Sequence, residues 1–503
     1  MIKNKNNFYK KLSITVIVIG ILLRFFLTSF YVVSGDACWQ LSAARFLAEN
    51  KKFPLYEPLG RPEPFWAPPV FHVMSAFFYS AFGIFGNNAA EFGMKMLSPL
   101  LGSLTLIFIY LINKKLFDEK TAFYSLLFTT FVPMFVDYNV FSYIDGVVTF
   151  FIVLGIYFTL NGKYIKSSIA GGLAALTKYN GIFVLPLLIY ITCKGTKNRK
   201  ELAKKLAVFL IVPMLIASPW FIRNYNDFGN PVWPFMNFIF NGKDTSAFES
   251  SELQKFRLGN VFSINSITFT YLSIFGVPNG NYNDIFFFKV PYIKALFVIW
   301  LFGTLVFLLP FAKGFAIKDK TKKRILIIWI VSYLAVLILY IGNVGWTAGR
   351  FFMPALPALG MIYGNGFSRI RFKSKNLMVS AHIILLLIIL GLVAAESTKI
   401  ILASRQWDSF EQDFMWIKDN TNKNALIMPD AQCLAYHTNR GTIKGTKENL
   451  KEADYIFVNQ NFNLERRAMV SDEILKELKT NASNYNKVYE NKMTKTSVYK
   501  VKK

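Results

Sequence analysis

The stretch Leu12–Tyr31, LSITVIVIGILLRFFLTSFY, is 20 residues long and contains one charged side chain, Arg24. A second run, Leu377–Ala395, is LMVSAHIILLLIILGLVAA and contains no Asp, Glu, Lys or Arg. A helix of this length rises about 30 Å, which matches the hydrocarbon core of a bilayer. No small-residue cleavage site follows the first run, so it is predicted to remain as a membrane span and not to be removed as a signal peptide.

The composition extends this pattern along the chain. Hydrophobic residues make up 53% of the 503 residues, and the mean hydropathy is +0.35. About eleven apolar segments are predicted to span the membrane, which argues against a soluble multidomain protein. The predicted spans are 12–31, 89–112, 121–142, 145–161, 167–179, 181–193, 206–222, 290–311, 325–343, 350–367 and 377–395.

The net charge of +27 is concentrated in short hydrophilic breaks between these segments. Six breaks hold 25 Lys and Arg residues but only four acids. Basic loops of this kind are typical of the cytosolic side of a membrane protein, and they form no continuous surface for nucleic acid. The N-terminus is therefore predicted to be cytosolic. The six breaks are 1–11, 113–120, 162–166, 194–205, 313–324 and 368–375.

This orientation places three longer segments outside the cell: 32–88, 223–289 and the tail 396–503. The apolar stretch 69–86 is predicted to lie in the outer membrane interface, because a further span would invert the topology downstream. The short pair 167–179 and 181–193 is predicted to be partly re-entrant. In the tail, β-type runs alternate with helical patterns, which predicts a small extracytoplasmic α/β domain after a membrane domain over 1–395. The β-type runs are 425–428, 455–458 and 497–501, and the helical patterns are 408–418 and 471–479.

Twelve acidic residues remain outside the cytosolic breaks and the tail, and each falls in an outward loop or at the outer end of a predicted span. Carboxylate chemistry is therefore predicted on the outer face. The twelve acids are Asp36, Glu49, Glu57, Glu63, Glu91, Asp137, Asp145, Asp227, Asp244, Glu249, Glu252 and Asp284.

Two of these acids are the main catalytic candidates. Asp36 follows the first span, where partial removal from water would make it a competent general base. Its alternative role is the N-cap of a helix over 37–48. Asp145 opens a later span and could orient an acceptor group or bind a divalent cation, or serve as an N-terminal helix acid.

Three basic residues are predicted at the same depth. Lys178 is flanked by apolar sequence on both sides, Arg223 closes one span, and Arg350 opens another. A charged side chain at membrane depth is usually functional, and three cations near one plane could hold a phosphate group. Secondary candidates on the acceptor side are Asp137, Tyr138, Glu63 and His72, although His72 also suits a packed histidine.

The remaining polar features have simpler expected roles. Arg24 is expected to extend toward lipid headgroups, and His437 is expected at the surface of the tail domain. A disulfide between Cys38 and Cys433 is compatible with the topology, but the spacing gives no indication of one.

Seven short motifs in order make the chain resemble the C-type (GT-C) glycosyltransferases, in the branch of protein O-mannosyltransferases and aminoarabinose transferases. They span residues 31–360. They are the acid Asp36 after the first span, Phe65-Trp-Ala-Pro-Pro-Val, the small-residue span from Leu97-Ser-Pro to basic residues, Tyr143-Ile-Asp145-Gly, the Gly-rich segment 171–178 ending in Thr-Lys, the Pro-Trp…Arg-Asn…Gly-Asn-Pro string at 219–235, and Arg350-Phe-Phe-Met-Pro-Ala-Leu-Pro.

The resemblance implies transfer of a sugar from a polyprenyl-phosphate donor to a protein, lipid or glycan acceptor on the outer face, with inversion. Asp36 would be the general base, Asp145 would position the acceptor or a metal, and Lys178, Arg350 and Arg223 would bind the donor phosphate. Many relatives have Asp-Glu where this chain has Asp36-Ala37, which leaves the acceptor class open. The alternatives are a polytopic transporter or flippase of lipid-linked saccharides and an inactive relative that only binds them. No cofactor is predicted with certainty, and a divalent cation is left open.

Overall fold

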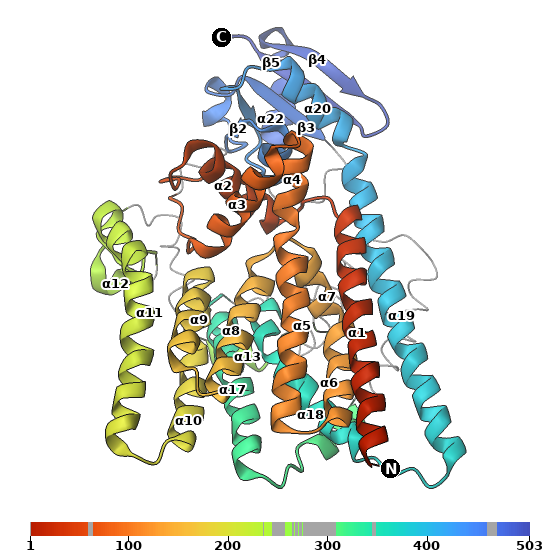
Figure 1. The fold of residues 1–503 in the computed structure, drawn as a ribbon. Coiled ribbons are helices and arrows are strands. Elements are labelled where there is room, and N and C mark those ends of the chain that lie inside the picture. Colours follow the sequence, from red (N-terminus) through yellow and green to blue (C-terminus); the bar gives the residue numbers. More distant parts are fainter. Residues whose placement is uncertain are drawn as a thin grey trace. The chain divides into compact units, whose positions relative to one another are not determined.

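The computed structural model divides the chain into two compact units, shown with the rest of the fold in Figure 1. The first unit comprises Met1–Ser29, Ala67–Val70 and Met96–Lys399. The second comprises Phe30–Trp66, Phe71–Lys95 and Ile400–Lys503. The predicted domain boundary at residue 395 stays a prediction. The structure describes residues 2–58, 64–234, 236–243, 257–263, 266, 270, 274, 308–344, 349–459 and 470–503.

The described part of the first unit is helical. Its elements are α1 (Ile2–Phe30), α5 (Leu97–Leu116), α6 (Glu119–Phe131), α7 (Pro133–Val140), α8 (Ile144–Leu160), α9 (Tyr164–Thr177), the 3-10 helix η1 (Tyr179–Val184), α10 (Leu185–Gly195), α11 (Arg199–Phe228), α12 (Asn237–Phe240), α13 (Leu258–Val261), α17 (Lys320–Val344), η4 (Gly349–Ala355), α18 (Leu356–Ser368) and α19 (Lys375–Asp408), which continues into the second unit.

Several of the described helices are apolar enough to cross a membrane, which confirms the predicted fold class. Five are long enough alone, and α7 with α8 makes a sixth candidate as a pair bent by 109°. Helices lie at ten of the eleven predicted span ranges, and most of 290–311 falls outside the described residues. The number of spans therefore stays a prediction. The five helices are Asn6–Phe30, Asn87–Leu116, Arg199–Phe228, Lys320–Gly342 and Lys375–Arg405.

Helices α6 and α18 pack closely because α18 presents glycine at two positions one turn apart. A Cβ atom at Gly360 would lie 2.1 Å from Thr129 Oγ1, and one at Gly364 would lie 2.5 Å from the Thr121 carbonyl oxygen. Small residues four apart let two membrane helices approach at backbone distance, where dispersion and polar contacts take the place of the hydrophobic effect.

Arg24 of α1 is fully buried, so the prediction that it extends to lipid headgroups is wrong. Its guanidinium donates to the carbonyl oxygens of Gly20, at 2.9 Å, and Thr130, at 3.1 Å, and lies over the Phe135 ring. Thr130 belongs to the last turn of α6, where carbonyls have no partner within the helix. A cation at the C-terminal end of a helix also interacts favourably with the helix dipole. Arg24 therefore stabilises the end of α6 before Pro133.

The second unit contains a five-stranded sheet with strand order β2-β1-β3-β5-β4. β1 is parallel to β2 and β3, and β5 is antiparallel to β3 and β4. The predicted α/β character of the tail is confirmed. The unit's elements are α2 (Asp36–Asn50), α3 (Val70–Gly83), α4 (Asn87–Lys95), α20 (Glu411–Asn420), β1 (Leu426–Met428), α21 (Gln432–Thr438), β2 (Gly441–Thr442), η5 (Glu448–Lys451), β3 (Tyr455–Asn459), α22 (Asp472–Thr480), η6 (Ala482–Asn484), β4 (Tyr485–Asn491) and β5 (Thr496–Val501).

The sheet is held on α22 by apolar packing and on α20 by a buried acid. Ile456 of β3 packs with Ile474 of α22, whose N-cap Ser471 accepts from the Ile474 amide. Asp413 of α20 is fully buried and accepts hydrogen bonds from Tyr489, Asn491, Thr494 and Thr496, at 2.6–2.8 Å. A carboxylate satisfied in this way is tolerated without a cation, because four donors replace its lost water. The stretch 69–86 is helical as α3, and its interfacial placement stays a prediction.

Candidate functional site

Lys178 occupies the break between α9 and η1 in the first unit. Its backbone is extended, at φ −154° and ψ 133°, so the side chain leaves the line of α9. The turn requires glycine at position 181, because a Cβ atom there would lie 2.3 Å from the Ala174 carbonyl carbon and oxygen. The Thr-Lys-Tyr-Asn-Gly sequence thus ends one helix, starts the next, and places a lysine between them.

The side chain of Lys178 is paired with Asp145. Lysine Nζ lies 2.6 Å from Oδ1 of the acid, and both side chains are largely buried, at 13% and 2% exposure. Asp145 lies in the first turn of α8, where a carboxylate faces the positive end of the helix dipole. Its other oxygen, Oδ2, has no hydrogen-bond partner among the residues that the structure describes. The site therefore holds a buried carboxylate oxygen with capacity for a donor.

A second cation lies next to this pair. Lys178 Nζ is 4.0 Å from the ring centre of Phe351 in η4. The neighbouring Arg350 has its guanidinium carbon 5.3 Å from the ring centre of Tyr143, two residues before Asp145. These contacts bring Arg350 of η4 to the region of Asp145 in α8 and Lys178 in the α9–η1 break, and a shared layer for the three stays a prediction. Their formal charges sum to +1.

Arg223 of α11 is linked to the same region through Tyr179. The Tyr179 hydroxyl accepts from Trp220 Nε1 at 3.0 Å and from Asn224 Nδ2 at 3.4 Å, on the same face of α11. Arg223 itself pairs with Asp227, Nε to Oδ2, at 2.9 Å, and lies over the Trp220 ring. Its charge is thus balanced at least in part by Asp227.

Asp137 belongs to a different buried cluster, which the sequence did not indicate. Its Oδ2 accepts from Lys399 Nζ of α19 at 2.7 Å, and Lys399 also pairs with Glu396 one turn earlier. The side chains of the two acids are at most 6% exposed. The sequence places Glu396 and Lys399 in the tail, because the last predicted span ends at residue 395. Their spacing of three residues after an apolar run was the available signal.

The other secondary candidates differ in their surroundings. Tyr138 has its ring 5.5 Å from that of Tyr143, in edge contact, which places it beside the ring under Arg350. His72 is fully buried in the second unit, with Nε2 2.6 Å from Gln40 Oε1, and suits a packed histidine. Glu63 lies outside the described residues.

Asp36 lies in the first turn of α2 and is half-buried. The N-cap position is taken by Gly35, at φ +58°, so the alternative role of Asp36 as the N-cap is wrong by one residue. The Tyr31 hydroxyl is buried and close enough to interact electrostatically with the Asp36 carboxylate. Asp36 is thus an acid at a positive helix end with a hydroxyl group close by.

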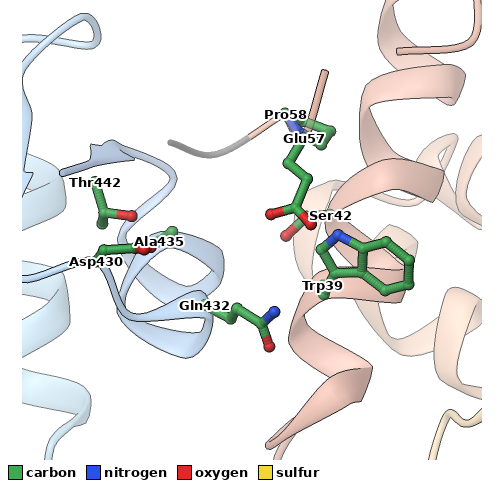
Figure 2. A pocket seen from close by; sticks show the side chains of 8 residues that line it. All are labelled: Trp39, Ser42, Glu57, Pro58, Asp430, Gln432, Ala435 and Thr442. Atoms are coloured by element: carbon green, nitrogen blue, oxygen red, sulfur yellow. The ribbon is translucent and has the colours of Figure 1, made fainter. Parts of the chain in front are cut away.

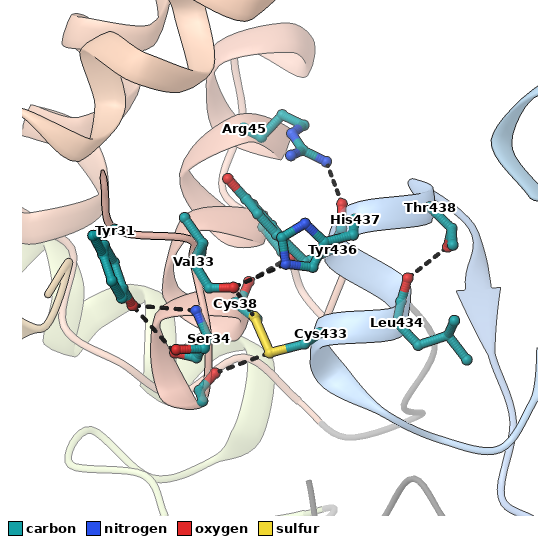
Figure 3. The surroundings of a disulfide bond; sticks show 12 residues. Tyr31, Val33, Ser34, Cys38, Arg45, Cys433, Leu434, Tyr436, His437 and Thr438 are labelled. Carbon is teal, nitrogen blue, oxygen red and sulfur yellow. Dashed lines mark hydrogen bonds between the residues drawn. A yellow bond between two sulfur atoms is a disulfide. The ribbon is translucent and has the colours of Figure 1, made fainter. Parts of the chain in front are cut away.

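A disulfide joins Cys38 of α2 to Cys433 of α21, 395 positions apart (Figure 3). Disulfides persist in oxidising compartments, which supports an outward location for both segments. Arg45 of α2 donates to the Tyr436 carbonyl at 3.1 Å and pairs with Glu91 at 2.7 Å. These contacts hold the helix that begins with Asp36.

His437 is half-buried and makes packing contacts within the second unit, so it lies less at the surface of the tail than predicted. Its Nε2 lies 2.8 Å from the Val33 carbonyl oxygen, and its ring stacks on Phe414 at an interplanar angle of 7°. Burial lowers the pKa of His437 to about 4. Val33 precedes Asp36 by three residues, so this neutral imidazole also fixes the loop that leads into α2.

A divalent cation at Asp145 has no ligand set in the described part of the chain. No three His, Cys, Asp or Glu side chains there are arranged to hold a metal ion. The partner of Asp145 is the ammonium group of Lys178.

Residues 67–222 match the family model described as dolichyl-phosphate-mannose-protein mannosyltransferase. This range contains the Asp145–Lys178 pair. No protein of curated function matches the chain in sequence.

Three solved structures are similar to the whole chain. ArnT from Cupriavidus metallidurans bound to undecaprenyl phosphate is 12% identical, with a TM-score of 0.62 and 97% of each chain covered. The Archaeoglobus fulgidus oligosaccharyltransferase AglB, in complex with an inhibitory peptide and a dolichol-phosphate, is 13% identical, with a TM-score of 0.54 over 90% of this chain and 70% of its own. The mycobacterial arabinofuranosyltransferase AftD is 12% identical, with a TM-score of 0.57 over 98% of this chain and 40% of its own.

Proposed function

Because this chain has the fold of the GT-C superfamily of membrane glycosyltransferases, we propose that it transfers a sugar from a polyprenyl-phosphate donor to an acceptor on the outer face of the membrane. The fold confirms the resemblance inferred from the seven motifs. ArnT is bound to undecaprenyl phosphate and AglB to a dolichol-phosphate in their structures, which supports the same class of donor here. The acceptor is a protein, lipid or glycan.

The observation that carries this proposal is the charge of the cluster in the first unit. Asp145, Lys178 and Arg350 together carry +1, and the phosphodiester of a polyprenyl-phosphate sugar carries one negative charge. As the bond to the sugar breaks, the leaving phosphate gains a second charge, and a phosphate monoester approaches −2 at neutral pH. Cations already positioned in a water-poor site stabilise this growing charge more than they stabilise the bound donor.

Within this cluster the residues have different tasks. Arg350 binds the phosphate through its planar guanidinium, which can donate two parallel hydrogen bonds. Lys178 supplies a point charge, and Asp145 holds the lysine in place before the donor arrives. The second oxygen of Asp145 remains available to an acceptor hydroxyl. Arg223 contributes a more distant positive charge.

Asp36 is the proposed general base. It removes the proton from the attacking acceptor group as that group forms its bond to the anomeric carbon. The bond from that carbon to the phosphate oxygen breaks on the opposite side, so the configuration inverts. The negative charge leaves with the polyprenyl phosphate, and the proton passes to the Asp36 carboxylate.

The test is release of polyprenyl phosphate from synthetic short-chain polyprenyl-phosphate mannose, glucose and aminoarabinose, with an extract of cell-envelope material as the acceptor source. Mass spectrometry of the lipid product detects turnover with any acceptor. Asp36→Asn should lower the rate about 10²- to 10⁴-fold, because a general base contributes this much. Glu49→Gln removes an exposed acid near the other end of α2 and serves as the matched control.

Two outcomes would contradict the proposal. Near-full turnover by folded Asp36→Asn protein would remove this acid from the mechanism. Movement of intact lipid-linked sugar across a vesicle membrane, without release of polyprenyl phosphate, would identify a flippase instead.

A further inference from the structure

The residues 31–35 form a loop between the end of α1 at Phe30 and the start of α2 at Asp36. Together with α2, this loop belongs to the second unit. Its last residue, Gly35, has φ +58° and ψ −140°, a conformation that residues with a side chain rarely adopt. Because Asp36 follows this turn directly, the conformation of the loop decides where the acid lies.

Side chains of α4 and α19 bind the first two residues of the loop. The Lys95 ammonium group donates to the Tyr31 carbonyl oxygen at 2.8 Å. The Ser404 hydroxyl oxygen accepts from the Val32 amide at 3.3 Å. Both contacts lie within the second unit, and they fix the end of the loop that is farther along the chain from Asp36.

The end of the loop that is nearer to Asp36 is bound by α21 of the tail. His437 Nε2 lies 2.8 Å from the Val33 carbonyl oxygen (Figure 3). Since a carbonyl oxygen can only accept, this nitrogen carries the proton and donates it. The His437 ring stacks on Phe414 with a centroid distance of 5.2 Å, and it lies 5.7 Å from the ring centre of Trp407. These aromatic contacts fix the direction in which the N–H group points.

Helix α21 is itself fixed against α2 at points along its length. Cys433 is joined to Cys38 by the disulfide, and the Tyr436 carbonyl oxygen accepts from Arg45 at 3.1 Å. The pocket that the two helices line with neighbouring segments has an enclosed volume of about 20 Å³, which is room for about one water molecule (Figure 2). His437 therefore binds the loop from a helix that is already held in place.

We propose that α21 of the tail positions Asp36 for removal of the acceptor proton, and that His437 is the residue through which it acts. The inference rests on the proposed transfer reaction, in which Asp36 is the general base. His437 is then a positioning residue, because it acts through the Val33 carbonyl group. A displacement of about 1 Å in a reacting group can lower a rate about 100-fold, so one contact to this loop affects turnover strongly. A purely structural histidine would affect stability and leave the rate per folded molecule unchanged.

Two variants separate the donor of His437 from its ring. His437→Phe keeps an aromatic ring beside Phe414 but removes the N–H group. His437→Gln keeps a neutral amide donor for the Val33 carbonyl but removes the ring. The matched control is Ile474→Ala, which destabilises the tail through the apolar core between the sheet and α22.

The full-length proteins are compared in lipid nanodiscs at a temperature where all of them are folded. Hydrogen exchange detected by mass spectrometry measures the protection of the amides of residues 32–38. Release of polyprenyl phosphate from the synthetic donors gives kcat and the KM for the donor.

His437→Phe should lower the protection of these amides about 2- to 10-fold, as for the loss of one neutral hydrogen bond. Its kcat should fall about 10-fold or more with little change in KM, because the base is displaced while the donor still binds. His437→Gln should keep most of the protection and of the kcat. Ile474→Ala should unfold at a lower temperature but keep the wild-type kcat and the protection of residues 32–38.

Three results would overturn the inference. The first is unchanged exchange of residues 32–38 in His437→Phe, because the contact would then not order the loop. The second is a normal kcat in His437→Phe despite faster exchange. The third is an equal loss of kcat in Ile474→Ala, because any destabilisation of the tail would then have the same effect. If the wild type releases no polyprenyl phosphate, the transfer proposal fails, whereas the exchange data still decide whether His437 orders the loop.

Discussion

Replacing Lys178 by methionine removes the cation that pairs with Asp145, a carboxylate whose side chain is 2% exposed. Methionine has a similar length, so the substitution deletes the charge and leaves little cavity. An acid left alone in a buried site destabilises the protein by about 3–5 kcal/mol, because the charge has lost both water and its partner. Asp145→Asn should destabilise less, since the lysine has a longer side chain that can reach a more polar position.

The double variant Lys178→Met with Asp145→Asn separates stability from function. Removing both charges together eliminates the penalty of the lone acid, so the unfolding free energy should return to within about 1–2 kcal/mol of the wild type. Transfer should not return. Loss of one preorganised electrostatic group costs about 10²- to 10³-fold in rate, and the double variant still lacks the cation.

The assay has two parts: thermal unfolding of the purified variants in nanodiscs, and release of polyprenyl phosphate at a temperature where all of them are folded. The control pair is Lys205 and Glu201 on α11, which are 2.7 Å apart with an acid that is largely exposed. Replacing both Lys205 and Glu201 should change neither the unfolding temperature nor the rate of polyprenyl phosphate release. Recovery of transfer together with stability in the Lys178–Asp145 double variant would refute the reasoning, because the pair would then be structural only.

Three further predictions concern single features of the two units. Arg350→Lys keeps the charge but removes the planar pair of donors, so transfer should fall about 10-fold or more while the unfolding temperature stays the same. Cys38→Ser with Cys433→Ser should lower the unfolding free energy by about 2–5 kcal/mol, and a reductant should no longer lower the unfolding temperature of this variant. Cys193→Ser removes a free cysteine and should unfold at the same temperature as the wild type. His437 is held neutral with its pKa lowered to about 4, against about 6.5 in the unfolded chain. The unfolded state therefore binds the extra proton, and stability should be lost as the pH falls from about 6.5 to 4, by about 3 kcal/mol in total; His437→Gln should remove this dependence in a pH series of unfolding curves.

Each of these has an outcome that contradicts it. Equal transfer by wild type and Arg350→Lys would exclude two-point recognition of the phosphate. A wild-type unfolding curve that is insensitive to reductant would mean that the disulfide does not stabilise the protein. An unchanged pH dependence in His437→Gln would assign acid sensitivity to other groups.

The apolar helices and the order of the tail elements could be predicted because their signals are local. An apolar run of about 20 residues without a carboxylate indicates a helix surrounded by lipid. The alternating runs near Leu426, Tyr455 and Thr496 indicate strands, and strands lie there. β4 (Tyr485–Asn491) was missed because it is a mostly exposed edge strand whose residues are largely polar. β2 consists of two residues and is too short for a periodic pattern.

The sequence predicts the individual residues of the candidate site but not which of them pair with one another. Lys178 stood out because apolar sequence surrounds it, and Asp145 because it begins a span. The contact between Lys178 and Asp145 depends on the turn from α9 into η1 and on the 109° bend between α7 and α8. No local sequence pattern predicts either the direction of this turn or the size of this bend. The burial of Arg24 escapes prediction for the same reason, since one of its two carbonyl acceptors lies 106 positions later.

The Cys38–Cys433 bond has a consequence for how the protein is made. On the proposed topology both cysteines are exported, and 394 residues are inserted or translocated after Cys38 before its partner emerges. Throughout that interval Cys38 is a thiol on the oxidising side with no native partner. A chain cut short anywhere before α21 could never close this bond, so its formation reports that every segment between the two cysteines has been made.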